Sequence, residues 1–376
     1  MSVPTLKIVE SLAGVAPAEW DALVGGQPLL SHAFLHALHE TGCASEETGW
    51  RPRYIVGYDH GRVVAAMPLY LKYHSYGEYV FDWAWADAYR RYGRRYYPKL
   101  LGAIPFTPAA GPRLLAHDPS HRRLLWDRAV ELARETKASS LHVLFPTDDD
   151  IASVTTRDVL HRTGLQYAWE NRGYTSFDAF LATMSHDKRK KIRQDRAHVA
   201  KAGIVFRRMN GREADASDWE FFYRCYENTY REHHSSPYLR LEFFARIARE
   251  MPDNVLLIVG DRDGEPHCAA LNVCNASTLW GRYWGTTGFV SGLHFEACYY
   301  QAIEHCIARG IARFEGGAQG HHKLARGFLP VETRSLHWIA DPEFASAIGE
   351  FVRRERRDVG QVLDELHESS PYKTTD

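Results

Sequence analysis

The stretch Glu315–Pro330 reads EGGAQGHHKLARGFLP and combines four glycines with five polar or basic side chains. Glycine adopts backbone angles that other residues avoid, and it lets a main chain approach a ligand closely. Loops held by a rigid scaffold often carry function, so we expect chemistry here; a solvated basic turn is the alternative. The glycines are Gly316, Gly317, Gly320 and Gly327, and the other residues are Gln319, His321, His322, Lys323 and Arg326.

The residues before this stretch predict a helix and then a short strand. Apolar residues recur from Phe295 to Ile307 at the i, i+3, i+4, i+7 spacing of an amphipathic helix. Gly310 stands where such a helix stops, and Ile311–Glu315 then has the pattern of a strand. The glycine-rich stretch therefore leaves the carboxyl end of a strand, where α/β folds tend to place ligands.

The chain of 376 residues has the length of about two domains and the composition of a folded protein. Its formal net charge of -1 gives no general attraction to nucleic acid or membrane, so such a partner must meet a local patch. The six cysteines form no CxxC pair, which fits a reducing compartment. We find no signal-peptide pattern and no apolar run of about 18 residues, and we expect a cytoplasmic protein without a transmembrane helix.

The first half predicts a hairpin and then alternating helices and strands. The hairpin covers 53–71 and turns at Asp59-His60-Gly61. The segment 98–112 holds four prolines, and we expect an irregular loop there. The remaining elements are expected as a helix at 120–137, a strand at 139–145, a helix at 151–163 and a strand at 165–174.

The aromatic segment 72–93 has no clean period of a helix or a strand. Its carboxylates Glu78, Asp82 and Asp87 stand among large rings, and such surroundings can raise a carboxyl pKa by desolvation. Glu78 and Asp82 are therefore candidates for acid–base chemistry. The alternative is that the rings pack a core and the carboxylates bind backbone amides.

The second half opens with a strongly basic segment. Nine Lys or Arg stand against one acid, Asp195, between Lys188 and Arg208. We expect a helix over 185–202 that ends at Gly203. Blocks of like charge are usually solvated faces. This one is joined to patterned sequence at both ends, so we expect a fixed basic ridge that suits phosphates.

The rest of the second half repeats the order hairpin, helix, strand, without a repeat that can be aligned. This order predicts a duplicated α/β unit, with domains at 1–174 and 175–345 and a helix and polar tail at 346–376. The pair His233-His234 is expected to be a surface turn, because adjacent histidines rarely converge on one metal ion. The expected elements are helices at 217–231 and 241–250, a hairpin of 255–260 with 267–275, and a strand at 278–285.

These motifs resemble the FemAB-like family, whose proteins contain two tandem GNAT-type acyltransferase domains. The resemblance covers roughly residues 30–355. It implies an α/β fold of two GNAT-like domains, with mixed sheets flanked by helices. The matching motifs are Phe314–Gly317, Gly320, Lys323, Gly327-Phe328 and the basic helix with Ala202-Gly203-Ile204 in the second half, and His74–Trp83, Tyr97–Leu100 and Pro105–Pro108 in the first half.

The resemblance implies an N-acyltransferase that forms an amide between an activated acyl donor and an amine of a small molecule or peptide. No covalent enzyme intermediate, metal or tightly bound cofactor is expected. Aminoacyl-tRNA is the expected donor and acyl-CoA the alternative, because Gly285–Gly292 lacks the spacing of the pyrophosphate loop in single-domain GNAT enzymes. The competing class is a non-catalytic double-GNAT protein that recognises a cell-wall precursor or nucleic acid.

The resemblance also assigns roles to residues. Lys323 or Arg326 would stabilise the oxyanion, and His322, Glu78 or Asp82 would be the base. The family's lysine lies closer to its Gly-Phe pair than Lys323 does, so Arg326 is the alternative in that place. We expect Lys323 to be catalytic and Arg326 to hold a donor phosphate or carboxylate. Further substrate-binding candidates are Gly316, Gly317, Gln319, Gly320, Tyr238, Arg282, Trp284 and His74, and phosphate- or tRNA-binding candidates are Lys188, Arg189, Lys190, Arg193 and Arg196.

Overall fold

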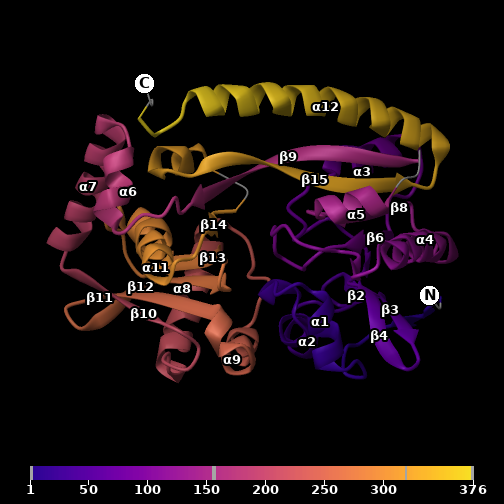
Figure 1. Cartoon of the computed structure of the whole chain (residues 1–376), viewed down its shortest axis with the longest axis horizontal. Helices are drawn as coiled ribbons and strands as arrows, with labels where there is room; N and C mark the ends of the chain where they lie inside the picture. The colour runs from indigo at the N-terminus through magenta and orange to yellow at the C-terminus, as the bar shows by residue number, and fades with distance from the viewer. Residues whose placement is uncertain (1–2, 155–157, 318–319, 374–376) are drawn as a thin grey trace. The chain divides into compact units, whose positions relative to one another are not determined.

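The computed structural model describes residues 3–154, 158–317 and 320–373 (Figure 1). The chain divides into two compact units. Unit 1 comprises Met1–Leu165 and Glu332–Val362, and unit 2 comprises Gln166–Val331 and Leu363–Asp376.

Two long strands carry the chain from one unit to the other. Strand β9 (Val159–Glu170) begins in unit 1 and ends in unit 2, and β15 (Leu329–Ile339) begins in unit 2 and ends in unit 1. Residues 332–345, which the sequence analysis placed in the second domain, thus fall in unit 1. Sequence patterns mark turns between elements, and they give no signal for a boundary inside a strand.

Unit 1 contains a sheet in the order β1-β3-β4-β7 and a set of paired strands in the order β15-β8-β6-β5-β2. The predicted hairpin is present as β3 and β4, but its second strand stops at Met67 and resumes at Tyr70 as part of the other sheet. Pro68 lies at the break, where it cannot donate a ladder hydrogen bond. The strands are β1 (Thr5–Val9), β2 (Trp50–Pro52), β3 (Tyr54–Asp59), β4 (Arg62–Met67), β5 (Tyr70–Lys72), β6 (Lys99–Gly102), β7 (Leu115–Ala116) and β8 (Ser140–Leu144).

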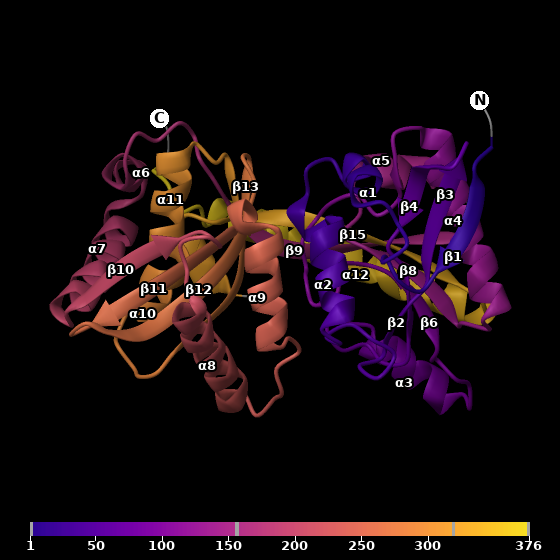
Figure 2. The same cartoon turned by 90° about the horizontal axis from the view of Figure 1, so that it is seen from below.

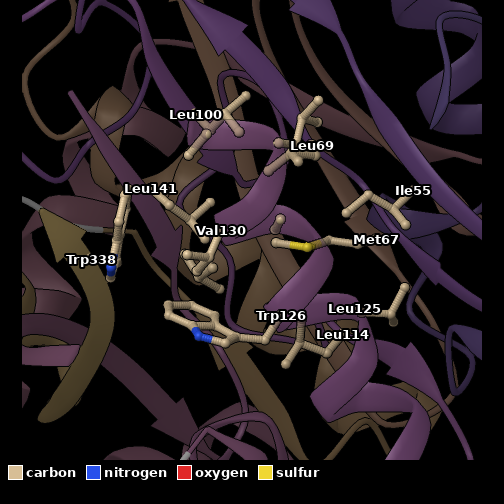
Figure 3. Close-up of a cluster of buried hydrophobic side chains, with 14 of the residues drawn as sticks. Ile55, Met67, Leu69, Leu100, Leu114, Leu125, Trp126, Val130, Leu141 and Trp338 are labelled. Carbon is tan, nitrogen blue, oxygen red and sulfur yellow. The ribbon is translucent and has the colours of Figure 1, made fainter. Parts of the chain in front are cut away.

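The core of unit 1 lies where helix α4 (Pro119–Glu135) packs on these strands (Figure 3). Trp126 and Val130 of α4 are buried with Met67 and Leu141 of the strands. Removing a large side chain such as Trp126 from such a core typically costs about 3–5 kcal/mol. The other helices of this part of the chain are α1 (Pro17–Leu23), η1 (Pro28–Leu30), α2 (His32–Glu40), α3 (Trp83–Arg91), α5 (Asp148–Ser153) and α12 (Pro342–Glu368).

Three predictions for unit 1 were wrong. The helix expected at 151–163 ends at Ser153, and Val159–Thr163 belongs to β9; residues 155–157 lie outside the described part. The aperiodic segment 72–93 contains helix α3. The proline-rich segment contains β6, which pairs with β5 on one side and β8 on the other. Its four residues lie between Pro98 and Pro105, so every residue of the strand keeps its N–H.

Unit 2 is built on strands in the order β10-β11-β12-β13-β14-β9 (Figure 2). All neighbouring pairs are antiparallel except β13 and β14, which run parallel. Helices α8 and α9 lie on one face of this sheet, and α11 lies on the other. The strands are β10 (Ile204–Met209), β11 (Val255–Arg262), β12 (Glu265–Cys274), β13 (Thr278–Thr286) and β14 (Arg313–Glu315), and the helices are α6 (Phe177–Thr183), α7 (His186–Lys201), α8 (Ala216–Glu232), α9 (Leu241–Glu250), η2 (Pro252–Asn254), α10 (Leu293–Phe295), η3 (Glu296–Tyr300), α11 (Gln301–Arg309) and η4 (His321–Arg326).

The basic helix and the helix before the glycine-rich stretch are both confirmed. The basic helix is α7, and the other runs from Leu293 to Arg309 through α10, η3 and α11. Gly310 ends it in the left-handed conformation, at φ 68°. The η3 segment is a π turn, which the apolar spacing did not predict, and π turns often occur at functional sites.

Candidate functional site

The sheet of unit 2 opens between β13 and β14. The two strands pair only through Thr278–Trp280, although β13 continues to Thr286. In addition, the register of β12 and β13 shifts between Leu271 and Asn272, which marks a β-bulge at this point of the ladder. Parallel strands that separate in this way leave a space at their carboxyl ends, where α/β proteins tend to bind ligands.

A cavity of about 120 Å³ occupies this opening. Asn272 on its wall is 2% exposed, and its amide Nδ2 has no hydrogen-bond partner among the described residues. A buried donor without a partner is unfavourable, so such groups usually hold a water molecule or a ligand. The lining residues are Ala270, Leu271, Asn272, Gly281, Arg282, Tyr283, Trp284, His294, Cys298, Tyr299, Phe314 and Gly316.

Lys323, on the short helix η4, is not one of the lining residues, but its side chain lies next to Gly316, which is on the cavity wall. Its side chain is buried, and Nζ donates to the carbonyl oxygen of Gly317 at 3.1 Å. This is the one acceptor that the described residues provide for the ammonium. Burial lowers the pKa of Lys323 to about 8. The ammonium is therefore poorly solvated and close to its titration point, as expected of a functional lysine.

The two glycines before Lys323 are needed for this geometry. Gly317 has φ 82°, a left-handed conformation that side chains disfavour, and its carbonyl holds the lysine. A Cβ on Gly316 would lie 2.9 Å from the Phe328 ring and 3.4 Å from Cδ of Lys323. The two glycines thus let the backbone pack closely around the lysine, whereas a close approach to a ligand at this stretch stays a prediction.

His294 and Tyr299 line the cavity, and His322 contacts both of them. Nε2 of His322 lies 3.1 Å from the hydroxyl of Tyr299, and the His322 and His294 ring centroids are 5.9 Å apart. Burial, and then the neighbouring His322, lower the pKa of His294 to about 4. Burial, and then Lys323, lower the pKa of His322 as well. Both imidazoles are therefore neutral near pH 7 and able to accept a proton.

Arg326 points to a different place from Lys323, although the two residues stand three positions apart on η4. Its guanidinium donates to Asp195 at 3.1 Å and to the carbonyl of His322 at 2.8 Å, and it lies 3.2 Å from the Phe295 ring centroid. Neither Arg326 nor Lys323 is among the residues that line the cavity, but Lys323 lies next to a lining residue, Gly316. The Arg326 guanidinium therefore binds other groups of the protein, and its ion pair with Asp195 connects η4 to α7.

The other candidates from the sequence are divided between several places. Arg282, Trp284 and Gly316 line the cavity. Gly320 has φ 110° and lies against the His322 ring, whereas the Tyr238 ring packs on Tyr230 outside the cavity lining. Gln319 lies outside the described residues. Asn272 and His294 were missed, because only the strand pairing and the π turn bring them to the opening.

Glu78, Asp82 and His74 belong to unit 1, whereas the residues that line this cavity belong to unit 2. Lys99, which is fully buried, donates to Glu78 at 2.7 Å, to Ser75 at 2.8 Å and to Asp82. Burial raises the pKa of Glu78 to about 7. Burial opposes ionisation of Asp82 too, but the Lys99 ammonium holds its pKa below the usual range. The two carboxylates thus bind a buried lysine. The sequence analysis considered acid–base chemistry and binding to backbone amides, and neither alternative included this lysine.

The basic ridge is smaller than its sequence indicates. Arg196 turns inward and pairs with Glu296 at 3.2 Å and Glu304 at 2.7 Å. Arg193 lies 3.7 Å from Asp178, and Arg189 donates to the carbonyl of Met184. Lys188, in the first turn of α7, and Lys190, just after that turn, have no acidic partner among the described residues. The free positive charge is therefore concentrated at the helix N-terminus.

Comparison with known proteins agrees with this architecture. The family model for FemAB-like proteins, described as peptidoglycan biosynthesis/recognition, matches residues 11–374. The crystal structure of FemX matches with a TM-score of 0.56 at 14% identity, covering 89% of this chain and 98% of FemX. The structure of L-PGS from Bacillus licheniformis matches with a TM-score of 0.57 at 10% identity, covering 92% and 99%. No curated protein matches in sequence.

These matches confirm the expected α/β fold of two GNAT-like domains. In the described part of the chain, no helix combines the length and hydrophobicity required to cross a bilayer. At such low identity the structural neighbours establish the fold alone, whereas the family model covers nearly the whole sequence. The chain therefore belongs to the FemAB-like family.

Proposed function

We propose that the chain is an N-acyltransferase of peptidoglycan synthesis that transfers an aminoacyl group from tRNA to an amine. Membership of the FemAB-like family supports an acyltransferase in this process. One observation carries the proposal within the chain itself. Lys323, buried and with its pKa lowered to about 8, lies next to Gly316 of the cavity wall, and its Nζ has one acceptor among the described residues.

The chemistry requires that an amine attack the carbonyl carbon of an activated acyl group. The carbonyl electrons move to the oxygen, and the negative charge that develops there is the main barrier. The Lys323 ammonium and the unpartnered Nδ2 of Asn272 are donors available to that oxygen. Each such donor typically contributes a factor of about 10²–10³ in rate. The intermediate then collapses, forming the amide and releasing the ribose oxygen of the tRNA as leaving group.

The attacking amine must also lose a proton. His322 is the proposed base, because its ring is neutral, partly exposed and hydrogen-bonded to Tyr299 at the cavity. A base in this role contributes about 10²–10⁴ in rate. Cys298 also lines the cavity, but burial raises the pKa of its thiol well above the usual value. A thiolate is therefore disfavoured, which supports direct transfer without a covalent enzyme intermediate.

The choice of tRNA as donor rests on α7. Cations in the first turn of a helix are disfavoured by the helix dipole, by about 0.3–1 kcal/mol each. Lys188 nevertheless stands in the first turn of α7 and Lys190 just after it, and neither has an acidic partner among the described residues. A polyanion that binds at this end would offset their repulsion and meet the free backbone N–H groups of the helix. Acyl-CoA, which also carries phosphates, is the alternative donor.

The test is a transfer assay with purified full-length protein. The acceptor is a peptidoglycan precursor peptide with a free amine, and the donor is either a pool of tRNA charged with radiolabelled amino acids or labelled acetyl-CoA. We expect label in the precursor only with charged tRNA, and none with Lys323→Met. Label that is transferred only from acetyl-CoA would show that acyl-CoA, and not aminoacyl-tRNA, is the donor. Binding of the precursor without transfer from either donor would contradict the enzymatic proposal.

A further inference from the structure

Helix α3 in unit 1 forms one side of an apolar groove of about 340 Å³. Ala84, Ala88 and Tyr92 follow one another at intervals of four residues, so they share one face of the helix. The other side is the start of α12, where Phe344 contacts both Tyr89 and Tyr92 of α3. The remaining lining residues are Trp85, Glu343, Ala347, Ile348 and Phe351. Glu343 is the one charged residue among them.

Exposed aromatic rings surround the start and the end of the same helix. Nine large apolar side chains are exposed in the described residues, and four of them lie between Tyr73 and Trp83. A fifth, Tyr92, lines the groove and is 78% exposed. The rings of Tyr76 and Trp83 are 5.1 Å apart. Such a concentration of exposed apolar surface marks an interaction site.

Polar contacts with other residues of unit 1 fix the segment that carries these rings. Arg162 donates to the carbonyl of Phe81 at 2.8 Å, and His74 contacts the carbonyl of Thr48 at 2.9 Å. The buried Lys99 binds two carboxylates of the same segment. A loop fixed by so many polar contacts presents its rings to solvent as part of the fold.

Four arginines lie at the C-terminal end of α3 and just after it in the sequence. Residues 83–97 contain Arg90, Arg91, Arg94 and Arg95 against one acid, Asp87, and all four arginines are exposed. Arg90 pairs with Asp87 at 2.9 Å. The other three have no partner among the described residues. The helix dipole favours cations in the last turn of α3, but Arg94 and Arg95 lie beyond its end.

We propose that this surface docks unit 1 onto an anionic lipid membrane. The rings of Tyr76, Phe81, Trp83 and Tyr92 enter the interface, where aromatic side chains are favoured, and the groove takes up an acyl chain. The arginines bind the phosphate groups of the lipid heads. Apolar groups flanked by cations are the pattern of proteins that lie on a bilayer. This inference does not depend on the transfer chemistry of unit 2.

The groove favours lipid over RNA as the partner. Bases would stack on exposed rings and arginines would bind their phosphates. However, Trp85, Tyr92 and Glu343 are the only lining residues with a polar side-chain group, so the groove offers few hydrogen bonds to a base, whereas a hydrocarbon chain needs none. The net charge of the whole chain is -1, so attraction to an anionic surface must come from a local cluster such as this one.

Vesicle co-sedimentation of the full-length protein tests the proposal. We expect binding to vesicles of phosphatidylcholine mixed with phosphatidylglycerol, weak binding to phosphatidylcholine alone, and loss of binding at high salt. Each basic residue near such a surface changes affinity about fivefold. Combining Arg91→Glu, Arg94→Glu and Arg95→Glu should therefore lower it about a hundredfold or more. The charge-matched control combines Lys188→Glu, Lys190→Glu and Arg193→Glu on α7 and should leave vesicle binding unchanged.

A second readout tests insertion of the rings. Lipids with brominated acyl chains should quench tryptophan fluorescence in the parent and quench it less in Trp83→Phe. Equal binding to both vesicle types, or equal loss in the α7 control, would overturn the proposal. Binding of tRNA that is lost in the arginine triple variant, without any vesicle binding, would assign the surface to nucleic acid. Transfer from charged tRNA in the absence of lipid should survive in that variant, so the two proposals fail separately.

Discussion

Arg326 of η4 and Asp195 of α7 form a buried ion pair, with Nη2 and Oδ2 3.1 Å apart. Asp195 is the one acid among the nine cations of the basic segment. It also accepts hydrogen bonds from Tyr300 at 3.1 Å and pairs with Lys191 at 3.2 Å. The pair fixes the short helix that carries Lys323, so the basic helix has a structural role in the candidate site.

Breaking this pair should destabilise the protein strongly. Asp195→Ala leaves a buried guanidinium without its counter-ion, and such losses are about 3–5 kcal/mol. Urea unfolding measures the change. The double variant Asp195→Leu with Arg326→Met removes both charges and should recover much of the stability. A loss below about 1 kcal/mol in Asp195→Ala, the range of exposed pairs, would show that the pair does not hold η4.

Lys323→Met should make the protein more stable at neutral pH. Burial lowers the pKa of Lys323 from 10.5 to about 8, which corresponds to about 3 kcal/mol of unfavourable desolvation. The pKa of Lys323 is lower in the folded state than in the unfolded state. The desolvation cost therefore lowers the free energy of unfolding by its full amount below pH 8, and it disappears as the pH rises to 10.5. Unfolding free energies should therefore differ most at pH 7 and converge above pH 10.5. A destabilised Lys323→Met variant at pH 7 would contradict the assigned burial.

Glu78→Gln should change the pH dependence of stability in the acid range. Burial raises the pKa of Glu78 from 4.5 to about 7. A raised folded-state pKa adds stability that is complete below pH 4.5 and is lost as the pH rises through about 7. The unfolding free energy of the parent should fall over this interval relative to Glu78→Gln. Glu131→Gln on the exposed face of α4 is the control, and a difference that is constant with pH for Glu78→Gln would refute the assignment.

Combining Lys188→Glu with Lys190→Glu should weaken tRNA binding. Each phosphate contact contributes about 0.7–0.9 to the slope of log affinity against log salt, so both affinity and slope should fall. The helix itself should gain slightly, because acids are favoured in its first turn. Arg249→Glu with Arg262→Glu, which are exposed elsewhere in unit 2, is the matched control. Unchanged filter binding of tRNA in the α7 variant would leave acyl-CoA as the donor to test.

Local patterns were sufficient for several elements of the site. The basic residues and Gly203 predicted α7, and the glycines predicted the turns around Lys323, because these features depend on neighbouring residues in the sequence. The fold followed from the order of elements together with the family resemblance. The short strand β6 was missed since its four residues carry no period that distinguishes a strand from a loop between prolines.

The contacts between residues far apart in the sequence could not be predicted from local sequence patterns. Asp195 and Arg326 are 131 residues apart, and Lys99 meets Glu78 across 21 residues. Each pairing joins segments whose neighbourhood is fixed by tertiary packing. The cavity likewise depends on where β13 stops pairing with β14. For this reason the sequence proposed Glu78 and Asp82 as partners of Lys323, although they lie in the other unit.

The most direct test of the account is turnover by Lys323→Met, measured with whichever donor supports transfer by the parent. Donor affinity is measured separately in both proteins, and Lys201→Met on the exposed end of α7 is the control. If Lys323 stabilises the oxyanion, turnover should fall about 10²–10³-fold while donor affinity stays the same. Turnover close to that of the parent, in a variant that remains folded, would contradict the central claim that transfer occurs at the opening between β13 and β14.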